Sequence, residues 1–282
     1  MTAQVEIRAL TPTIGAEVTE VDLATEIDNV ELVAVLKAAF LKHHVLVFRD
    51  QHVTTEQHKK FGRLFGDLHI HPTQRGQGYQ GDCEIFRVHA DEATTLNNGG
   101  LWHSDVSCDE VPPLGSMLLL TTAPDQGGDT LFANMHEAYL ELSEPIRELL
   151  HGLVAVHDQR RDMRNYGYEP RPGFDYPRHS HPMVVAHPET LKPLLFVNPA
   201  FTTHIEGLSA AESAALLDLL HNTTANNPRL QCRVRWEPGT LTFWDNRCVQ
   251  HYAVWDYRPH VRSGNRVTIA ASSAPAAFAA MD

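Results

Sequence analysis

Four short stretches of this 282-residue sequence place a histidine two positions before an acidic residue. On an extended segment, residues i and i+2 point to the same side, so one such pair can give two ligands to a single metal ion. Two histidines and one carboxylate on one face of an iron ion leave the opposite coordination positions open. The third ligand must then come from another part of the chain. The four pairs are His89-x-Asp91, His103-x-Asp105, His187-x-Glu189 and His204-x-Glu206.

The surroundings of each pair help to choose among them. The pair at His187 encloses a proline and is typical of a β-turn between two strands. The pair at His204 leads through a glycine toward a helix start, which indicates a connector, and the pair at His89 runs into a polar loop. His103-x-Asp105 is flanked by apolar residues on both sides, which fits a position at the mouth of a packed sheet. We therefore favour this pair, although spacing alone does not separate it from a surface His and Asp.

A segment near the C-terminus supplies a partner for His103 and Asp105. Residues 243–251 run from an apolar strand through a turn to an extended segment that ends in His251. Arg262 follows eleven residues later, and Arg266 four beyond it. An iron ion that chelates the keto-acid end of a dicarboxylate leaves the far carboxylate free, and the planar fork of arginine can bind that group through two hydrogen bonds. The pattern therefore indicates a metal site that also holds a small dicarboxylate.

Composition limits the classes of partner. The chain has 23 basic and 35 acidic side chains and a formal net charge of −12, which argues against nucleic acid or an anionic membrane as a general partner. We find no apolar run of the ~18 residues that a membrane-spanning helix needs, and the first residues lack the pattern of a signal peptide. The four cysteines form no CxxC pair, so we expect reduced, mostly buried thiols in a cytoplasmic protein.

The elements that must position these residues are mostly short strands, a pattern typical of a sandwich or barrel rather than of a doubly wound sheet. Two helix starts have capping-box spacing, Thr54 with Gln57 and Ser209 with Glu212. Residues 67–101, rich in Gly, His, Asn and Gln, predict a long loop region with one short strand. The predicted strands are 5–10, 17–21, 44–48, 83–88, 115–121, 131–133, 153–157, 183–187, 194–197, 231–236, 240–244 and 266–271, and the predicted helices are 29–42, 54–65, 136–150 and 209–220.

Several longer motifs together make the chain resemble the taurine dioxygenase (TauD/TfdA) family, which also contains aryloxyalkanoate dioxygenases and alkylsulfatases. The resemblance covers nearly the whole chain, which we expect to form one domain over residues 1–282. The motifs are specific for the family, though not for a substrate. They are IGAEV at 14–18, FRDQ at 48–51, FGDLHIHP at 65–72, WHSDVS at 102–107, GGDTLF at 127–132, HPMVVAHP at 181–188, FVNPAFTTHI at 196–205 and WDNRCVQHYAVWDY at 244–257.

The resemblance implies a mainly β fold with helical inserts, built on a double-stranded β-helix, the jelly roll of cupins. It implies that His103, Asp105 and His251 bind Fe(II). It also implies that Arg262, assisted by the hydroxyl of Thr130, binds the far carboxylate of 2-oxoglutarate. The implied reaction consumes O2 and 2-oxoglutarate, hydroxylates a small anionic substrate, and releases succinate and CO2.

Three further residues match substrate-side positions of taurine dioxygenase. Arg266 matches the position that meets the sulfonate, His71 a substrate-side histidine, and Phe201 an apolar wall. The chain departs from that enzyme at other contacts: Gln74 stands where a tyrosine is usual, Gly99 where an asparagine is usual, and Gly264-Asn265 where Met-His is usual. An anionic substrate is therefore expected, with a taurine-like sulfonate favoured and taurine itself in doubt.

Other functions remain open at this point. Within the family, the substrate could be an aryloxyalkanoate, an alkyl sulfate or an amino acid. A zinc hydrolase could use the same triad but would not need Arg262, and a non-catalytic jelly-roll binding protein would not need the triad. Asn246, Gln250 or backbone carbonyls are candidates to orient His251. We also expect a homodimer or homotetramer.

Overall fold

The computed structural model describes residues 5–75 and 79–279. The helices are α1 (Leu23–Glu26), α2 (Val30–His43), α3 (Thr55–Arg63), α4 (Met135–Leu140), α5 (Glu144–Leu150), α6 (Gln159–Asn165) and α7 (Ala210–Ala225). The strands are β1 (Glu6–Ala9), β2 (Ala16–Thr19), β3 (Val45–Phe48), β4 (Phe86–Ala90), β5 (Gly115–Thr122), β6 (Thr130–Asn134), β7 (Val154–Asp158), β8 (Arg178–Pro182), β9 (Val184–Ala186), β10 (Pro193–Leu195), β11 (Thr202–Ile205), β12 (Gln231–Val234), β13 (Leu241–Asp245), β14 (Val249–Ala253), β15 (Arg262–Ile269) and β16 (Ala276–Ala277).

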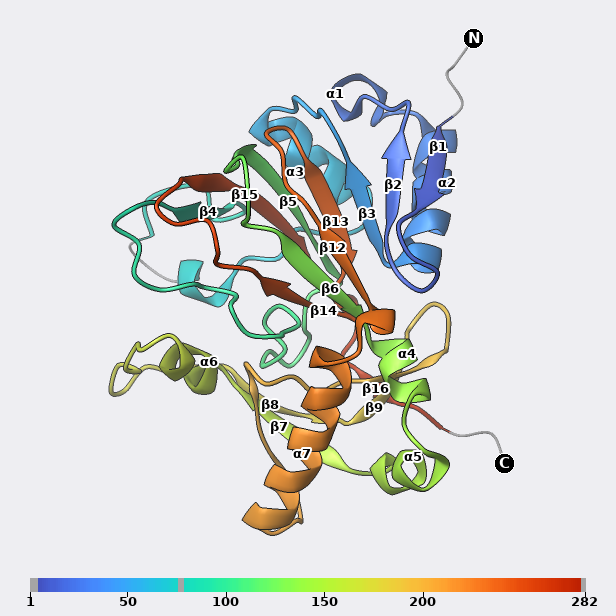
Figure 1. Ribbon diagram of the computed structural model, residues 1–282, viewed down its shortest axis with the longest axis vertical. Helices are drawn as coiled ribbons and strands as arrows, with labels where there is room; N and C mark the ends of the chain where they lie inside the picture. The colour runs from blue at the N-terminus through green and yellow to red at the C-terminus, as the bar shows by residue number, and fades with distance from the viewer. Residues whose placement is uncertain (1–4, 76–78, 280–282) are drawn as a thin grey trace.

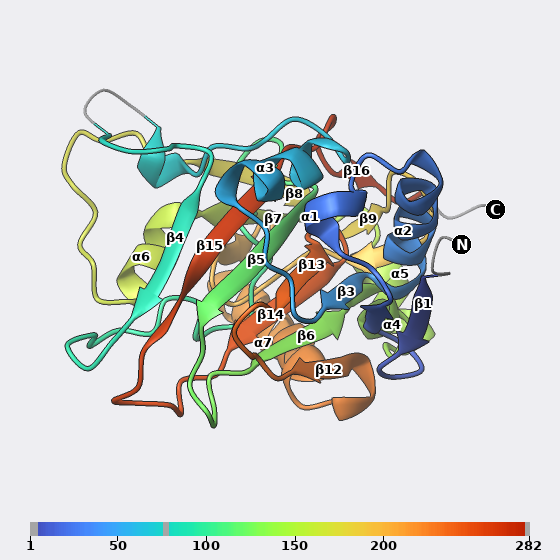
Figure 2. The ribbon, with the colours of Figure 1, turned by 90° about the horizontal axis from the view of Figure 1, so that it is seen from above.

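A seven-stranded sheet forms the centre of the molecule, with strand order β1-β2-β3-β13-β5-β15-β4. Its pairs are antiparallel except for the parallel pair β2–β3. Figure 2 shows α1, α2 and α3 lying over one face of this sheet. Successive side chains along each strand point to opposite faces of the sheet, so they contribute in turn to two separate hydrophobic cores. On β3, for example, Leu46 and Phe48 pack with the helices, whereas Val45 and Val47 pack on the other face.

A smaller sheet with the order β12-β6-β14 lies against that other face. Its buried residues, including Phe132, Val234 and Val249, share one core with Val45, Val47 and Leu120 of the large sheet. Two antiparallel sheets that face each other across one core have the layered arrangement of a jelly roll. The predicted mainly β fold is therefore present, and its two layers supply the strands on which the site is built.

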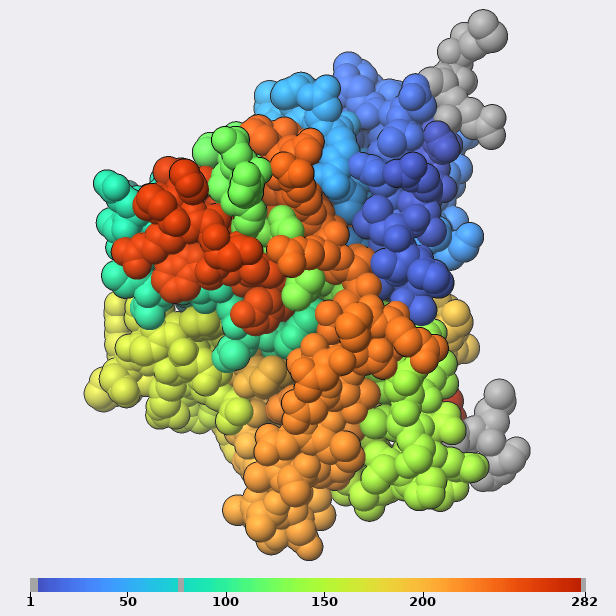
Figure 3. All heavy atoms as spheres, viewed as in Figure 1, coloured from blue at the N-terminus to red at the C-terminus, as the bar shows by residue number. Residues whose placement is uncertain are grey.

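The remaining elements pack beneath the two sheets (Figure 1). They include two three-stranded sheets, β11-β7-β8 and β10-β9-β16. In the space-filling view, the orange atoms that include α7 form a band between the green atoms of α4 and α5 and the yellow-green atoms around α6 (Figure 3). Among the residues that the structure describes, none belongs to a helix with the length and apolar character needed to cross a membrane.

Some predicted elements have other bounds in the structure. The single helix expected at 136–150 is two helices, α4 and α5, because Ser143 begins a new helix with a proline in its first turn. The strand expected at 83–88 is displaced to Phe86–Ala90. Helices α1 and α6 and strands β8, β11 and β16 were not predicted, so His204 lies on β11 rather than on the connector expected there. The extended segment expected to end at His251 is β14. Both capping boxes are present as predicted.

Candidate metal centre

The three residues predicted as metal ligands come together between the two sheets. His103 and His251 face each other across an isolated antiparallel bridge. The backbone N–H of His103 donates to the carbonyl oxygen of His251 at 3.0 Å, and the reciprocal bond is 2.8 Å. The Nε2 atoms of the two rings lie 3.8 Å and 3.9 Å from Oδ1 of Asp105. All three side chains are buried.

Asp105 is held from several directions. The Ser116 hydroxyl donates to Oδ2 at 2.7 Å, and the Arg266 guanidinium donates to Oδ1 at 2.6 Å. The side chain of Asn246 binds the backbone of Asp105, accepting from its N–H at 2.6 Å and donating to its carbonyl oxygen at 2.9 Å. Burial alone would raise the pKa of this carboxyl. The Arg266 guanidinium outweighs burial and holds the pKa below its ordinary value, so the carboxylate is ionised.

The backbone after Asp105 adopts a rare conformation. Val106 is a buried β-branched residue with φ of 49°. Such residues seldom enter the left-handed region, and the cost is of order 1–3 kcal/mol. A strained backbone next to a predicted ligand is typical of functional sites, where the surrounding structure fixes a direction that the local sequence disfavours.

The histidines present the right atoms for a metal. Nδ1 of His103 contacts the Leu101 carbonyl oxygen at 2.7 Å and must donate there, which leaves the lone pair on Nε2 facing Asp105. Nδ1 of His251 is buried without a hydrogen-bond partner among the described residues. Burial lowers the pKa of both imidazoles, so they are neutral. Two neutral imidazoles and one carboxylate match the donor set that suits Fe(II) with open positions.

Arg262 lies where a dicarboxylate would need it. This arginine and Arg266 are four residues apart on β15, so their side chains project from the same face, and both are buried. Nη2 of Arg262 lies 3.4 Å from the hydroxyl oxygen of Thr130, and Nε donates to the Gly128 carbonyl oxygen at 3.0 Å. The guanidinium also lies over the ring of Trp236, 5.4 Å from its centroid. This packing orients the fork, and in the part of the chain that the structure describes Nη1 of Arg262 makes no hydrogen bond.

The residues predicted on the substrate side lie near the triad. The Arg266 guanidinium stacks over Phe86 with its carbon 4.7 Å from the ring centroid, and its Nε has no hydrogen-bond partner among the described residues. The His71 ring packs on the same phenylalanine at 4.7 Å between centroids. Burial and then Arg266 lower the pKa of His71 to about 3, so this imidazole is neutral. The Phe201 ring centroid is 6.5 Å from that of His103.

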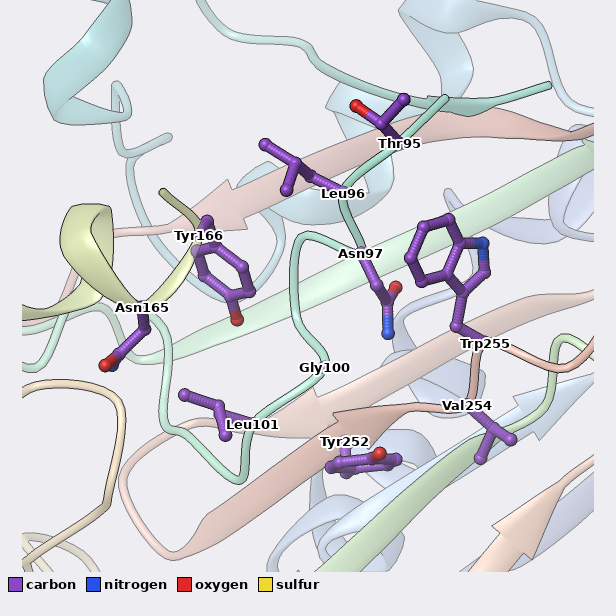
Figure 4. Close-up of a pocket in the computed structure, with 10 residues that line it drawn as sticks. All are labelled: Thr95, Leu96, Asn97, Gly100, Leu101, Asn165, Tyr166, Tyr252, Val254 and Trp255. Atoms are coloured by element: carbon purple, nitrogen blue, oxygen red, sulfur yellow. The ribbon is translucent and has the colours of Figure 1, made fainter. Parts of the chain in front are cut away.

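A cavity of about 600 Å³ borders the segments that carry the ligands (Figure 4). The rings of Tyr166, Tyr252 and Trp255 and the side chain of Asn97 lie around it, with Leu101 at its edge. Leu101 precedes His103 by two positions and Tyr252 directly follows His251. The cavity wall therefore adjoins two predicted ligands in sequence, but Tyr252 and His251 are neighbours on β14 and point to opposite sides. Arg262, Arg266 and His71 do not line it.

The departures from taurine dioxygenase have structural counterparts. The side-chain amide of Gln74 donates to the Tyr79 hydroxyl at 2.6 Å and to the Ile85 carbonyl oxygen at 2.8 Å. These bonds hold the surrounding loop together. At Gly99 the backbone N–H donates to the Tyr166 hydroxyl at 2.9 Å. Tyr166, which directly follows α6, thus lies at the position where the family has an asparagine and this chain has Gly99.

Two residues near the site escaped the sequence analysis. Ser116 places a hydroxyl group within the buried, mostly apolar strand β5. A polar residue in such a run could have been recognised from the sequence as a candidate functional residue. Asp162 lies on α6, which was not predicted, and nothing in its local sequence marks it. Burial and then repulsion by Asp105 raise the pKa of Asp162 to about 7. Its carboxylate makes no hydrogen bond or ion pair within the described part of the chain.

Our expectation for the support of His251 was wrong in part. Asn246 binds the backbone of Asp105 rather than His251. Gln250 donates to the Val197 carbonyl oxygen at 2.6 Å, because alternate residues of β14 point to opposite sides and Gln250 faces away from its neighbour His251.

The three other His-x-acid pairs lie apart from this centre. His89 and Asp91 contact each other near the surface, and His204 is exposed. His187 is buried but binds Asp245 at 3.1 Å, while Glu189 turns outward to Arg247. All four cysteines are free thiols, and three of them are buried.

Comparisons with known proteins agree with this geometry. A family model described as "Taurine catabolism dioxygenase TauD, TfdA family" matches residues 6–268. An alpha-ketoglutarate-dependent sulfonate dioxygenase of Saccharomyces cerevisiae is 35% identical, and the match covers 94% of this chain and 66% of the yeast protein, just under two thirds of its length. An alkylsulfatase of Acinetobacter baylyi is 34% identical, over 95% of this chain and 86% of its own.

Solved structures show the same fold. A taurine dioxygenase from Burkholderia xenovorans is 33% identical with a TM-score of 0.82, over 98% of this chain and 93% of its own. The structure of AAD-2 in complex with Mn(II) and N-oxalylglycine is 24% identical with a TM-score of 0.81, over 96% of this chain and 99% of its own. The jelly-roll prediction is confirmed by these neighbours.

Proposed function

The chain belongs to the TauD, TfdA family of Fe(II)- and 2-oxoglutarate-dependent dioxygenases, and from this premise we propose that it hydroxylates a carbon atom of a small organic anion. O2 and 2-oxoglutarate (also called alpha-ketoglutarate) are consumed, and succinate and CO2 are released. The observation that carries the proposal is the buried His103–Asp105–His251 cluster with two buried arginines on the adjoining face of one strand.

We infer that His103, Asp105 and His251 hold Fe(II). The neutral imidazoles and the ionised carboxylate support this role. When bound, the iron supplies the redox chemistry that couples decarboxylation of 2-oxoglutarate to oxygen insertion into a C–H bond. The protein contributes rigid ligands: the strand pairing of His251 and the Asn246 clamp on the backbone of Asp105 keep the three side chains in place.

We infer that Arg262 and Thr130 bind the far carboxylate of 2-oxoglutarate. A buried guanidinium strengthens a charge-assisted hydrogen bond because little water competes for it. The stacking of Arg262 on Trp236 supports this role, since the arginine is oriented before the cosubstrate arrives. A zinc hydrolase that used the same triad would have no need for such a residue, and a non-catalytic binding protein of this fold would have no need for the triad.

We infer that Arg266 receives the anionic group of the substrate, with His71 and Phe201 beside it. Nε of Arg266 has no acceptor among the described residues, and this supports the role because a buried donor without an acceptor favours an incoming anion. A sulfonate is the preferred group. If the carbon that bears the sulfonate is hydroxylated, the product collapses to an aldehyde and releases sulfite.

A sulfate ester is the second candidate substrate. The alkylsulfatase of Acinetobacter baylyi and a sulfate ester dioxygenase of Pseudomonas putida both match more than nine tenths of this chain at 34% identity. Relatives described as phenoxypropionate dioxygenases, 32% identical in one case, keep aryloxy acids within the range to be tested.

A substrate screen tests the proposal directly. The full chain, loaded with Fe(II) without oxygen, is given 2-oxoglutarate and then O2 with a panel of sulfonates, sulfate esters and aryloxy acids. We expect a visible charge-transfer band on addition of 2-oxoglutarate, and succinate release that one substrate class stimulates strongly. Absence of the band in folded, iron-loaded protein would overturn the dioxygenase assignment. Stimulation by sulfate esters alone would overturn the sulfonate choice and leave the reaction class intact.

A single domain, a cytoplasmic location and a homodimeric or homotetrameric state stay predictions from the sequence.

A further inference from the structure

A second cluster of potential metal ligands lies apart from the triad. His44 directly follows α2 and caps its C-terminal end, His136 lies in the first turn of α4, and Cys248 lies in the turn between β13 and β14. Their exposed fractions are only 6%, 5% and 1%. One ligand atom from each lies within 4.8 Å of the other two.

One atom of this cluster lacks a partner. Nδ1 of His136 contacts the Pro193 carbonyl oxygen at 2.7 Å and must donate to it, so the lone pair of this ring is on Nε2. Nε2 is buried and makes no hydrogen bond with any residue that the structure describes. A buried acceptor without a donor costs about 1–3 kcal/mol. A hydrogen bond from the Cys248 thiol to His44 does not remove this cost, because it leaves His136 as it was.

We propose that His44, His136 and Cys248 form a second metal site, chemically distinct from the iron centre, that binds Zn²⁺. Imidazole nitrogen and thiolate sulfur are the donors that zinc prefers, whereas the iron centre offers no sulfur. Sγ of Cys248 lies 3.4 Å from Nδ1 of His44. Two ligands at the usual zinc distances in a tetrahedral site are separated by roughly 3.5 Å, so the observed pair needs little movement.

The ionisation states agree with this geometry. Burial lowers the pKa of His44 and of His136 to about 4, so both rings offer a lone pair at neutral pH. Burial, and then Asp245, raise the pKa of the Cys248 thiol. Zinc must therefore displace the thiol proton, and binding is expected to release one proton and to weaken as the pH falls.

The neighbours of the cluster form a second layer around it. His187 and Asp245 have ligand atoms within 4.8 Å of Cys248. Their side chains are engaged with each other at 3.1 Å, and Arg247 binds Asp245 through Nε and Nη2 at 2.8 Å and 2.7 Å. This arrangement neutralises the Asp245 charge, so we assign these residues to orienting the turn, with His187 the nearest additional imidazole.

The site would connect to the iron centre through the same turn. Asn246, which holds the backbone of Asp105, lies two residues before Cys248, and His251 lies three residues after it. Zinc bound at Cys248 would fix this turn to α2 and α4, and so fix the backbone that positions two of the three iron ligands. The proposed zinc ion would therefore stabilise the fold around the iron centre and take no part in the reaction.

Cobalt substitution tests the site without reference to turnover. Co²⁺ is titrated without oxygen into the metal-free full chain, and the near-ultraviolet thiolate-to-cobalt charge-transfer band is recorded. We expect the band in the wild type and in His103→Ala, which lacks an iron ligand. We expect it to be lost in Cys248→Ser and in His136→Gln, and kept in Cys83→Ser, a matched control whose thiol lies outside the cluster.

Metal analysis adds a second readout. After incubation with Zn²⁺ and removal of excess metal, Cys248→Ser and His136→Gln should each retain one zinc ion fewer per chain than the wild type. Absence of a sulfur-to-cobalt band in the folded wild type, or its persistence in folded Cys248→Ser, would overturn the proposal. If Cys248→Ser does not fold, the wild type and His136→Gln decide the question. The band does not depend on succinate release, so failure of the dioxygenase proposal would leave this result unaffected.

Discussion

Nη1 of Arg266 lies 2.6 Å from Oδ1 of Asp105, and that same oxygen faces Nε2 of both His103 and His251. The Arg266 guanidinium therefore lies close enough to interact with a metal ion bound at Asp105 and with a substrate anion. A cation bound to Asp105 competes with Arg266 for the carboxylate, and a substrate anion offers Arg266 a replacement partner. Occupation of the metal site and of the substrate site should thus favour each other.

Arg266→Gln tests this relationship. We expect the KM for the anionic substrate to rise about tenfold to a hundredfold, the loss of one charge-assisted bond of 1.5–3 kcal/mol. Affinity for Fe(II), measured by anaerobic titration, should stay the same or increase because a competing cation is gone. Arg87→Gln is the control, since Arg87 lies on the neighbouring strand β4 and is exposed. A large loss of iron affinity in Arg266→Gln would contradict the argument.

His103→Ala and His89→Ala form a matched pair of histidine-x-acid variants. We expect His103→Ala to abolish succinate formation and stoichiometric iron binding, because one of the three proposed iron ligands is lost. His89→Ala should retain both, since His89 and Asp91 lie near the surface. Succinate release and bound iron are measured for each variant. The opposite result would mean that the wrong pair had been chosen.

Arg262→Lys separates cosubstrate binding from metal binding. Lysine keeps the charge but loses the planar fork, so we expect the KM for 2-oxoglutarate to rise about tenfold or more. Thr130→Val should raise it less, because it removes one hydroxyl. Iron affinity without 2-oxoglutarate should not change in either variant, and this measurement is the control. Equal effects on iron and on 2-oxoglutarate would indicate general damage to the site.

Asp162 should make stability depend on pH. Its pKa is raised to about 7, so between roughly pH 4 and 7 the folded chain binds this proton more tightly than the unfolded chain does. The contribution of Asp162 to the free energy of unfolding therefore falls as the pH rises through that window. Asp162→Asn should be more stable than the wild type at pH 8, by about 1–3 kcal/mol, with the difference shrinking toward pH 4. Urea unfolding of metal-free protein measures it, and a difference independent of pH would contradict this assignment.

Gly264→Ala should destabilise the fold. Gly264 lies on β15 between the two buried arginines, where the register with β5 shifts, and an added Cβ would overlap the Leu119 carbonyl oxygen. We expect a loss of about 2–4 kcal/mol, because the neighbour is backbone and cannot move aside cheaply. Gly167→Ala is the comparison, since an added Cβ there meets nothing within 4 Å, although its positive φ still carries a smaller penalty. A thermal melt that ranks the two variants in the reverse order would refute this explanation.

Much of the scaffold was predictable because its signals are local. The capping boxes at Thr54 and Ser209 depend on residues three apart, and the buried strands β3, β5 and β13 are apolar runs. An extended segment ending at His251 was expected, but the bounds and the partner of β14 were not. Val249–Ala253 has no clear alternation of apolar and polar residues, and its place depends on pairing with β6. The break between α4 and α5 was likewise visible only as a single proline.

The same distinction between local signals and long-range contacts applies to the candidate site. The triad and Arg262 could be chosen because the distant segments carry recognisable motifs. The contacts of Asn246 with Asp105, of Tyr166 with Gly99, and of Arg266 with Asp105 join residues 67 to 161 positions apart. No local rule predicts such pairs, since they follow from how the two sheets and α6 pack together.

The paired backbone bonds between His103 and His251 have a kinetic consequence. They join the segment at His103 to the edge of β14 by one antiparallel bridge. Because both bonds must break together, the backbone amides of His103 and His251 should exchange with solvent deuterium at one common rate. That rate would follow the opening of the sheet and not that of the loop before residue 103. The lifetime of this strand pairing therefore sets how long the imidazoles of His103 and His251 stay side by side.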